Sequence, residues 1–312
     1  VKVEKDGQTV DRVLLSGVSG YAQPYKMLSL MGASGAGKTT LLDVLSGRKN
    51  TGVIEGKILL NGQPATSTLV AQLCGYVEQF DTLFPFSTVY ETLIFAARLR
   101  LPSHVPYKVK VQIVNEILDI LDLSPMRDYL IGNAKVQGLS PAQLKRVNIG
   151  VELVANPAVL FLDEPTTGLD SRSAQTVMRV VKRITKSGRA IICTIHQPSA
   201  ELFFMFDRLC LLGSGGHQIY FGDLGHRSRI FVQYLSSCPG VLPIKPRTNP
   251  ASWMLQELGV GVASQKGDVE AKLASSSPTS SDQRFQVVDD PEWANLNSQQ
   301  RTVQRFKKIY FQ

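Results

Sequence analysis

The stretch MLSLMGASGAGKTTLLDVLSG, residues 27–47, decides the fold. Residues 27–32 form an apolar run typical of a buried strand, a glycine-rich turn extends to Gly37, and Lys38 and Thr39 open a helical pattern. This is the G-x-x-x-x-G-K-[ST] phosphate loop. Its glycines let backbone N–H groups converge on phosphate, while Lys38 reaches the β and γ oxygens and the Thr39 hydroxyl ligates Mg²⁺.

A phosphate loop between a strand and a helix predicts an α/β fold, with a P-loop NTPase core and a mostly parallel sheet. We expect a nucleotide and Mg²⁺ as ligands, and the resemblance described below implies that the nucleotide is ATP. The residues predicted to bind the nucleotide here are Gly32, Ser34, Gly35, Ala36, Gly37, Lys38, Thr39 and Thr40.

Two carboxylates follow a second apolar strand, PAVLFLDEP, far downstream. Asp163, at the end of that strand, is predicted to hold Mg²⁺ through water. The adjacent Glu164 points elsewhere and is predicted to orient or deprotonate the attacking water. An acidic strand cap would explain this pair less well beside a phosphate loop.

A third apolar strand, RAIICTIHQPS, is predicted to end at His196, just before a helix that begins near Ser199. A histidine after a strand is more often an ordinary polar residue. In a parallel sheet, however, the carboxyl ends of strands gather ligands, so we predict that His196 contacts the γ-phosphate.

The stretch GLSPAQLKRVNIG, residues 138–150, has the features of a helix start. Ser140 is the predicted N-cap, Pro141 occupies the first helical position, and Gln143 completes a capping box. The open N–H groups of such a start also suit a phosphate. Ser140 and Gln143 are therefore candidate nucleotide-binding residues.

Composition limits the alternatives. The chain has 312 residues, 43% hydrophobic and 19% charged, enough for one large domain or two ordinary ones. Four scattered cysteines indicate neither a zinc site nor a disulfide framework. The net charge of +8 is a mild excess. No apolar run approaches the ~20 residues of a membrane-spanning helix, and the absence of an initial Met leads us to expect a segment of a longer protein.

Together these motifs resemble the nucleotide-binding domain of an ABC transporter from about Val10 to Leu258. The phosphate loop, GYVEQ, GLSPAQ, FLDEP, GLD and His196 occur in the family's order. The resemblance implies that Gln79 contacts Mg²⁺ and the attacking water, that Asp170 lies in a loop touching a partner domain, and that Ser140 belongs to the signature motif. It also implies an antiparallel β subdomain and a helical subdomain, about 88–155, carrying that motif.

Further segments, NIGVEL, IYFGDLG and PGVLPIKPRTNPASWMLQELGVGV, resemble the G subfamily and its pleiotropic-drug-resistance branch. The signature form, with Pro141 and Ala142 in place of two glycines, resembles the second, C-terminal domain of full-size exporters. We expect the Ala142 methyl group to lie where the backbone approaches the γ-phosphate. Adenine is expected to meet a loose apolar surface near Val10.

We expect three parts in the chain: an ATP-binding domain over 1–258, a Ser- and Gly-rich linker over 259–288, and a helical segment over 289–312 that leads toward a membrane domain or is merely solvated. Residues Phe80, Phe84, Pro85 and Phe86 form a short connection. Contact with a membrane domain and a buried aromatic cluster are equally open explanations for it.

The sequence thus predicts an ATPase that couples ATP hydrolysis to export, at the cytosolic face of a membrane such as the plasma membrane. Its expected partners are a second nucleotide-binding domain and transmembrane domains, with no nucleic acid. One alternative is a soluble ABC ATPase acting on nucleic acid or ribosomes, which lacks support because no long heptad insertion or basic aromatic stripe is present. A regulatory module without turnover is disfavoured by the presence of Glu164 and His196.

Overall fold

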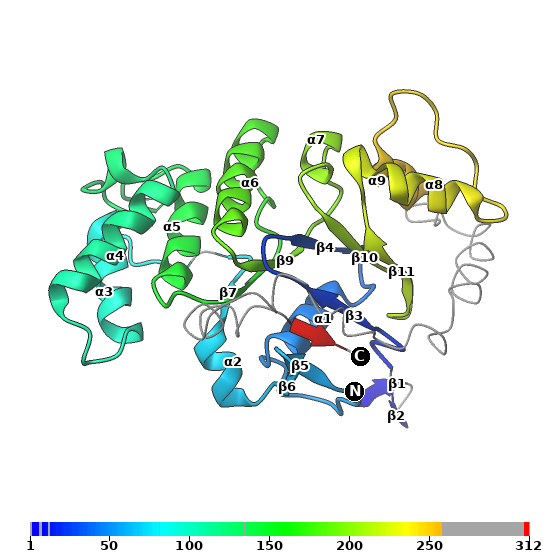
Figure 1. Ribbon diagram of the computed structural model, residues 1–312, viewed down its shortest axis with the longest axis horizontal. Helices are drawn as coiled ribbons and strands as arrows, with labels where there is room; N and C mark the ends of the chain where they lie inside the picture. Colours follow the sequence, from blue (N-terminus) through cyan, green and yellow to red (C-terminus); the bar gives the residue numbers. More distant parts are fainter. Residues whose placement is uncertain are drawn as a thin grey trace, which may run out of the picture.

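The computed structural model describes residues 2–5, 8–11, 13–80, 82–133, 135–257 and 309–311, and only the backbone for 2–5, 8–11 and 309–311. The predicted linker over 259–288 lies outside these residues. A main sheet, sandwiched between helices, forms the centre of the molecule (Figure 1). In order across this sheet the strands are β11 (Gln218–Asp223), β10 (Arg208–Leu212), β4 (Met27–Gly32), β9 (Ala190–Thr194), β8 (Val159–Leu162) and β7 (Cys74–Val77).

All neighbouring strands in this sheet are parallel except β10 and β11, which form an antiparallel pair. Strands β4, β8, β9 and β10 are buried along their whole length. This pattern is expected of parallel strands covered by helices on both faces. Consequently the carboxyl ends of β4, β7, β8 and β9 lie along one edge of the sheet.

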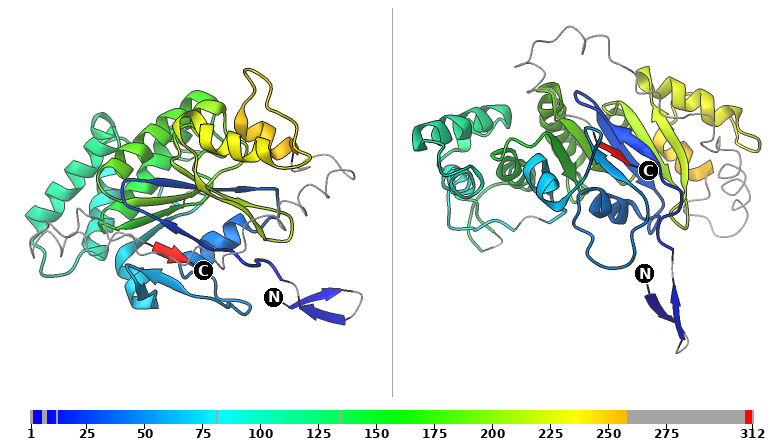
Figure 2. Two further views of the ribbon diagram at one scale, coloured as in Figure 1. Left: turned by 45° about the vertical axis from the view of Figure 1, so that its right-hand side comes forward. Right: turned by 60° about the horizontal axis from the view of Figure 1, so that its bottom comes forward.

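Side chains alternate between two hydrophobic cores along β4. Met27 and Met31 pack into the larger core, whereas Leu28 and Leu30 face the smaller one. Helix α1 (Lys38–Leu45) covers the smaller core, while α6 (Ser171–Lys186) covers the larger one from the opposite face (Figure 2). The P-loop NTPase core predicted from the sequence is therefore confirmed.

Helices α3 (Val89–Arg100), α4 (Tyr107–Ile120) and α5 (Pro141–Leu153) pack together at one end of the molecule (Figure 1). They lie within the range 88–155 predicted as the helical subdomain, and a 3₁₀ turn, η1 (Ser124–Met126), follows α4. The opposite end holds η2 (His226–Ser228), α8 (Arg229–Ser237) and α9 (Pro250–Glu257). Short helices α2 (Ser67–Leu73) and α7 (Ala200–Phe203) complete the helical elements of the described residues.

A second sheet contains β3 (Gly20–Ala22), β12 (Ile309–Phe311), β5 (Ile58–Leu60) and β6 (Gln63–Pro64), and every pair in it is antiparallel. A separate hairpin joins β1 (Lys2–Lys5) to β2 (Gln8–Asp11). The predicted antiparallel β subdomain corresponds to the second sheet. The side chain of Val10, named for adenine contact, lies outside the described part of the chain.

Strand β12 contradicts the predicted helix over 289–312 at its last described residues. Ile309, Tyr310 and Phe311 are β-branched or aromatic residues that favour strands, and their backbone pairs with β3 on one side and β5 on the other. The helical prediction was wrong for these three residues. Sequence periodicity does not show that β3 and β5 leave room for another strand between them. The rest of that segment lies outside the described residues.

Candidate functional site

The phosphate loop connects β4 to α1, as predicted. Gly32, Gly35 and Gly37 all have positive φ angles, of 153°, 78° and 90°. A side chain at Gly32 would place its Cβ 2.3 Å from the carbonyl oxygen of Leu212, so only glycine fits where β4 passes β10. Within the loop and the first turn of α1, Ser34, Gly35 and Thr39 are exposed, Thr40 is half-buried and Ala36 is buried.

Lys38 folds back over this loop. Its Nζ donates to the carbonyl oxygens of Gly32, at 3.1 Å, and Ala33, at 2.7 Å. Burial lowers the pKa of Lys38, and the charges of Glu164 and Asp163 act in the opposite direction. The hydrogen bonds of the Lys38 ammonium in the described residues thus go to backbone carbonyls, and a phosphate bound at the loop would give it a charged partner in direct contact.

Asp163 follows β8 directly and is 7% exposed. Three hydroxyl groups donate to its carboxylate: Thr194 at 2.6 Å, Thr39 at 3.4 Å and Tyr76 at 3.5 Å. Burial raises the pKa of Asp163, and the Thr194 hydrogen bond opposes this shift. Among the residues that the structure describes, no cation forms an ion pair with this carboxylate.

The donor set therefore fits Mg²⁺. A buried carboxylate beside the Thr39 hydroxyl lacks a counter-charge, and hard oxygen ligands of this kind suit that ion. The described residues contain no cluster of three or more His, Cys, Asp or Glu side chains that could hold a metal ion.

Glu164 and Gln79 contact each other across the ends of β8 and β7. The Gln79 amide donates to Glu164 Oε2 at 2.9 Å, and the Thr167 hydroxyl donates to the same oxygen at 2.8 Å. The Glu164 backbone has a φ of 44°, and its N–H donates to the Thr194 hydroxyl at 2.8 Å. This turn directs Glu164 toward Gln79 while Asp163 faces Thr39, which separates the two carboxylates as predicted from the sequence.

His196 lies at the same edge, two residues beyond the end of β9, and its side chain is exposed. Strand β9 ends at Thr194, earlier than expected, and the Ile195 N–H still pairs with the Leu30 carbonyl of β4 at 3.2 Å. This hydrogen bond keeps the segment alongside β4, the strand that leads into the phosphate loop. The site residues that follow β4, β7, β8 and β9 therefore lie along one sheet edge.

Ser140, Gln143 and Asp170 belong to helix starts instead. The Ser140 N–H donates to Gln143 Oε1 at 2.8 Å at the start of α5. Asp170 caps α6 by accepting the N–H groups of Arg172 and Ser173, both at 3.0 Å. A hydrogen bond with the Ser173 side chain, together with these N–H groups, lowers the pKa of Asp170. Ser140 and Asp170 are exposed, and within the described residues no hydrogen bond joins any of the three to the phosphate loop.

The signature segment differs from expectation at Ala142. Its side chain is 9% exposed and belongs to the larger hydrophobic core, so the methyl group does not occupy the outer surface where a phosphate would approach. The expectation was wrong because the first turn of α5 directs this position toward the core. Gly138 is sterically required, since a Cβ there would lie 2.3 Å from the carbonyl oxygen of Ile131.

Three side chains that sequence reasoning missed support the site. Thr194 connects Asp163 to the backbone of Glu164. Tyr76 donates to Asp43 at 2.9 Å as well as to Asp163. Lys145 of α5, 4% exposed, donates to the backbone carbonyls of Glu78, at 3.3 Å, and Gln79, at 2.8 Å. The sequence gives no signal for them, because the burial of Lys145, and with it the need for a partner, is seen only in the structure.

Comparison with known proteins agrees with this geometry. The ABC transporter family profile matches residues 15–167. Pleiotropic drug resistance protein 1 of Nicotiana tabacum is 48% identical over 256 residues, 82% of this chain and 18% of that protein. Pleiotropic drug resistance protein TUR2 of Spirodela polyrhiza is 49% identical over 251 residues, 80% of this chain and 17% of that protein. The chain therefore spans under a fifth of the length of these curated relatives.

The fold has a solved counterpart. A crystal structure of a nucleotide-free ATP-binding cassette from an ABC transporter superposes with a TM-score of 0.56 at 23% identity, covering 67% of this chain and 85% of the other. None of the described helices combines the length and apolar character needed to cross a bilayer. Since the fold, the nucleotide-site motifs and the relatives agree, the chain belongs to the ABC transporter family and is one of its nucleotide-binding ATPase domains, related to the G-family pleiotropic drug resistance proteins.

Proposed function

We propose that this ATPase domain is the motor of a membrane exporter, in which the contact between Gln79 and Glu164 beside Asp163 forms the catalytic centre. This contact carries the proposal because it joins the Gln79 amide, which can orient a water molecule, to Glu164, the candidate base. Both lie at the edge of the main sheet where β4 leads into the phosphate loop. Lys38 leaves its carbonyl partners to bind the β and γ phosphates of ATP. Further contacts come from backbone N–H groups and side chains of the loop: Gly32, Ser34, Gly35, Ala36, Gly37, Thr39 and Thr40.

In the proposed reaction, Glu164 accepts a proton from the attacking water, whose position Gln79 fixes by hydrogen bonding. Thr39, Asp163 and Gln79 would hold Mg²⁺, which supplies charge stabilisation to the phosphate oxygens. His196, exposed at the same edge, donates to the γ-phosphate. Thr194 keeps the two carboxylates apart by bonding Asp163 and the Glu164 backbone.

Ser140, Gln143 and Asp170 are proposed to act on a second domain. Ser140 and Asp170 are exposed and Gln143 is half-buried, and no hydrogen bond in the described residues joins them to their own phosphate loop, so these helix starts suit a nucleotide held by a partner. Two such domains would close head to tail over two ATP molecules. In this arrangement ATP binding drives closure, and hydrolysis with phosphate release reopens the pair.

An aromatic surface beside Gln79 is proposed to contact the transmembrane domains. Phe80, Phe84 and Phe86 are 75%, 66% and 63% exposed, and the rings of Phe84 and Phe86 pack edge to face at 5.7 Å. The structure thus contradicts the alternative of a buried cluster. Exposed apolar patches of this kind mark interaction sites. Since Phe80 directly follows Gln79, a displacement of Phe80 by a bound partner would also displace Gln79 in the proposed catalytic centre.

We place the domain at the cytosolic face of a membrane, such as the plasma membrane, as part of an exporter of small or lipophilic compounds. The related proteins are named for drug resistance and ABC transport, and they give no support to a soluble factor acting on nucleic acid. The chain resembles the second nucleotide-binding domain of a full-size exporter in its GLSPAQ signature.

Two substitutions test the catalytic assignment. Lys38→Ala removes the cation that stabilises the β and γ phosphates, so ATP affinity should fall at least about tenfold. Glu164→Gln keeps the binding groups but removes the base, so ATP should still bind while hydrolysis falls by about a hundredfold or more. Nucleotide titration and steady-state phosphate release measure both effects. Near-normal hydrolysis by Glu164→Gln would disprove the catalytic role.

A further inference from the structure

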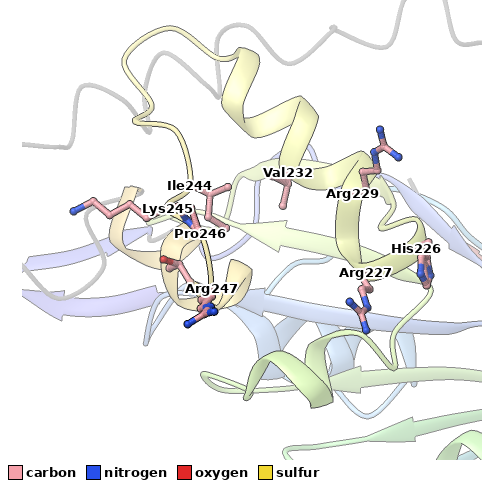
Figure 3. A pocket seen from close by; sticks show the side chains of 9 residues that line it. His226, Arg227, Arg229, Val232, Ile244, Lys245, Pro246 and Arg247 are labelled. Carbon is pink, nitrogen blue, oxygen red and sulfur yellow. The ribbon is translucent and has the colours of Figure 1, made fainter.

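A basic hollow lies at the end of the molecule opposite helices α3 to α5, remote from the phosphate loop (Figures 1 and 3). Its volume is about 500 Å³. It lies between η2 with the start of α8 and the segment before α9. The residues lining it are His226, Arg227, Arg229, Val232, Ile244, Lys245, Pro246, Arg247 and Thr248.

The lining combines positive charge with an apolar floor. Arg227, Arg229, Lys245 and Arg247 are cationic, and no acidic residue is among the lining residues. Within the part of the chain that the structure describes, none of these side chains has an ion pair or a side-chain hydrogen bond. Like charges gathered without a counter-charge repel one another, so an anion would be attracted here.

Two arginines stand out by their placement. Arg227 and Arg247 come from opposite walls, and Figure 3 shows both side chains extending to the same side of the hollow, whereas Arg229 and Lys245 point away from it. Both arginines have left-handed backbones, with φ angles of 49° and 63°. Such conformations are uncommon for residues other than glycine and persist where the surrounding structure holds them.

The η2 turn that carries Arg227 also contains an unsatisfied polar group, on a residue that does not itself line the hollow. Ser228, between Arg227 and Arg229, is 1% exposed, and its hydroxyl lacks a hydrogen-bond partner among the described residues. A planar guanidinium forms paired hydrogen bonds with phosphate oxygens. Val232, Ile244 and Pro246 supply a surface for an apolar portion of the same ligand.

We propose that this hollow binds a ligand carrying a phosphomonoester group, clamped by Arg227 and Arg247, with an apolar portion against Val232 and Ile244. The phosphomonoester is doubly charged near neutral pH and offers three oxygens, so it gains more from two arginines than a carboxylate or a phosphodiester does. A phosphorylated lipid headgroup and a small phosphorylated metabolite share this chemistry. The site is independent of ATP hydrolysis.

Vesicle sedimentation of the 312-residue chain tests the proposal, with Mg-ADP present throughout to fill the phosphate loop. We expect binding to phosphatidylcholine vesicles containing phosphatidic acid, which carries a phosphomonoester, and weaker binding when phosphatidylserine supplies the same charge. The double variant Arg227→Gln/Arg247→Gln should lower the affinity for phosphatidic acid vesicles at least about tenfold. Glutamine, like arginine, is not β-branched, so the substitutions leave the left-handed backbone at both positions no more strained. Thermal unfolding of the variant checks that it is folded.

The matched control is Arg98→Gln/Lys108→Gln, which removes two exposed charges on α3 and α4. Glycerol phosphate tests for a soluble ligand. If it binds in calorimetry and the arginine substitutions abolish this binding, the site is supported and its ligand is a small metabolite. If the chain binds phosphatidic acid vesicles but not glycerol phosphate, and this binding needs the two arginines, the site is supported and its ligand is a lipid headgroup. Equal binding to both kinds of vesicle, an equal loss in the control variant, or no binding in either arm would overturn the proposal.

Discussion

Thr194 connects the two functional carboxylates of the site. Its hydroxyl donates to Asp163 at 2.6 Å and accepts the Glu164 N–H at 2.8 Å, while its own side chain is completely buried. The Thr194 side chain thereby donates a hydrogen bond to the buried Asp163 carboxylate. It also holds the backbone turn at Glu164, so that the two neighbouring carboxylates point in different directions. The separation of roles between Asp163 and Glu164 depends on this hydroxyl.

Replacing Thr194 tests this dependence. Thr194→Val keeps the shape but removes the shortest hydrogen bond to the Asp163 carboxylate and the acceptor of the Glu164 N–H, so we expect the unfolding free energy to fall by about 1–3 kcal/mol. Thr194→Ser retains the hydroxyl and should lose less. Urea unfolding of both variants measures the difference, and equal stabilities for Val and Ser would show that the hydroxyl contributes nothing.

Residue-level prediction succeeded where a motif specifies the backbone as well as the side chain. The phosphate loop places Lys38 and Thr39 at the start of α1 after β4, and the FLDEP stretch places Asp163 at the end of β8, because apolar runs mark the strands and parallel strands end at one edge. Thr194 and Tyr76 were missed, since a threonine inside a strand gives no sign of the carboxylate beside it. Their hydrogen bonds depend on the order of β4, β9, β8 and β7 in the sheet.

At the scale of elements, α5 is tied to the segment that follows β7. Lys145 reaches from the signature helix to the carbonyl groups of Glu78 and Gln79, and Gln79 in turn bonds Glu164. A displacement of α5 would therefore move the backbone at Gln79, which belongs to the proposed catalytic centre. The sequence predicted α5 and its cap, but it did not predict this contact, which joins residues 66 positions apart.

Lys145→Met should separate the two elements while preserving the length of the side chain. We expect ATP affinity to change little and the turnover rate kcat to fall at least about tenfold, because a small misplacement of Gln79 is costly for catalysis. Lys145→Arg keeps a donor and should retain more activity. The measurement is kcat alongside nucleotide affinity, and a purely structural role would lower thermal stability without changing kcat.

Another contact between elements makes stability depend on pH. Arg183 of α6 donates to both oxygens of Asp122, at 2.8 and 2.9 Å, and to the carbonyl of Ile120 at the end of α4. The hydrogen bonds from Arg183 lower the pKa of Asp122 below its ordinary value of 3.8. This contribution is fully present above pH 3.8 and is lost as the pH falls through the lower, folded-state pKa.

Arg183→Gln should therefore reduce unfolding free energy at neutral pH and have a smaller effect in acid. Both side chains are about half exposed, so solvent screening limits the expected loss to about 0.5–1 kcal/mol. Urea unfolding across this pH range measures the trend. In an Asp122→Asn background the same substitution should have little further effect, and an undiminished effect would show that the ion pair is not responsible.

For the whole molecule, the proposed head-to-tail pairing implies that the domain alone is an incomplete enzyme. The groups predicted to bind phosphate and water gather at one edge, whereas Ser140 lies at the exposed start of α5, without a hydrogen bond to the phosphate loop in the described chain. Head-to-tail pairing would complete two sites at once, each from one chain's Lys38 and the other chain's Ser140. The rate of ATP hydrolysis per chain should then rise with protein concentration.

Mixing two inactive variants tests this arrangement directly. Lys38→Ala disables a chain's own phosphate loop, and Ser140→Arg obstructs the site that the chain completes in its partner, so neither variant should hydrolyse ATP alone. In a mixed pair both defects fall in the same site, and the other site has an intact loop and an intact signature. With random pairing of equal amounts, activity should recover to about a quarter of that of the unmodified chain at the same total concentration. Phosphate release measures this recovery, and a mixture as inactive as its components would exclude sites shared between chains.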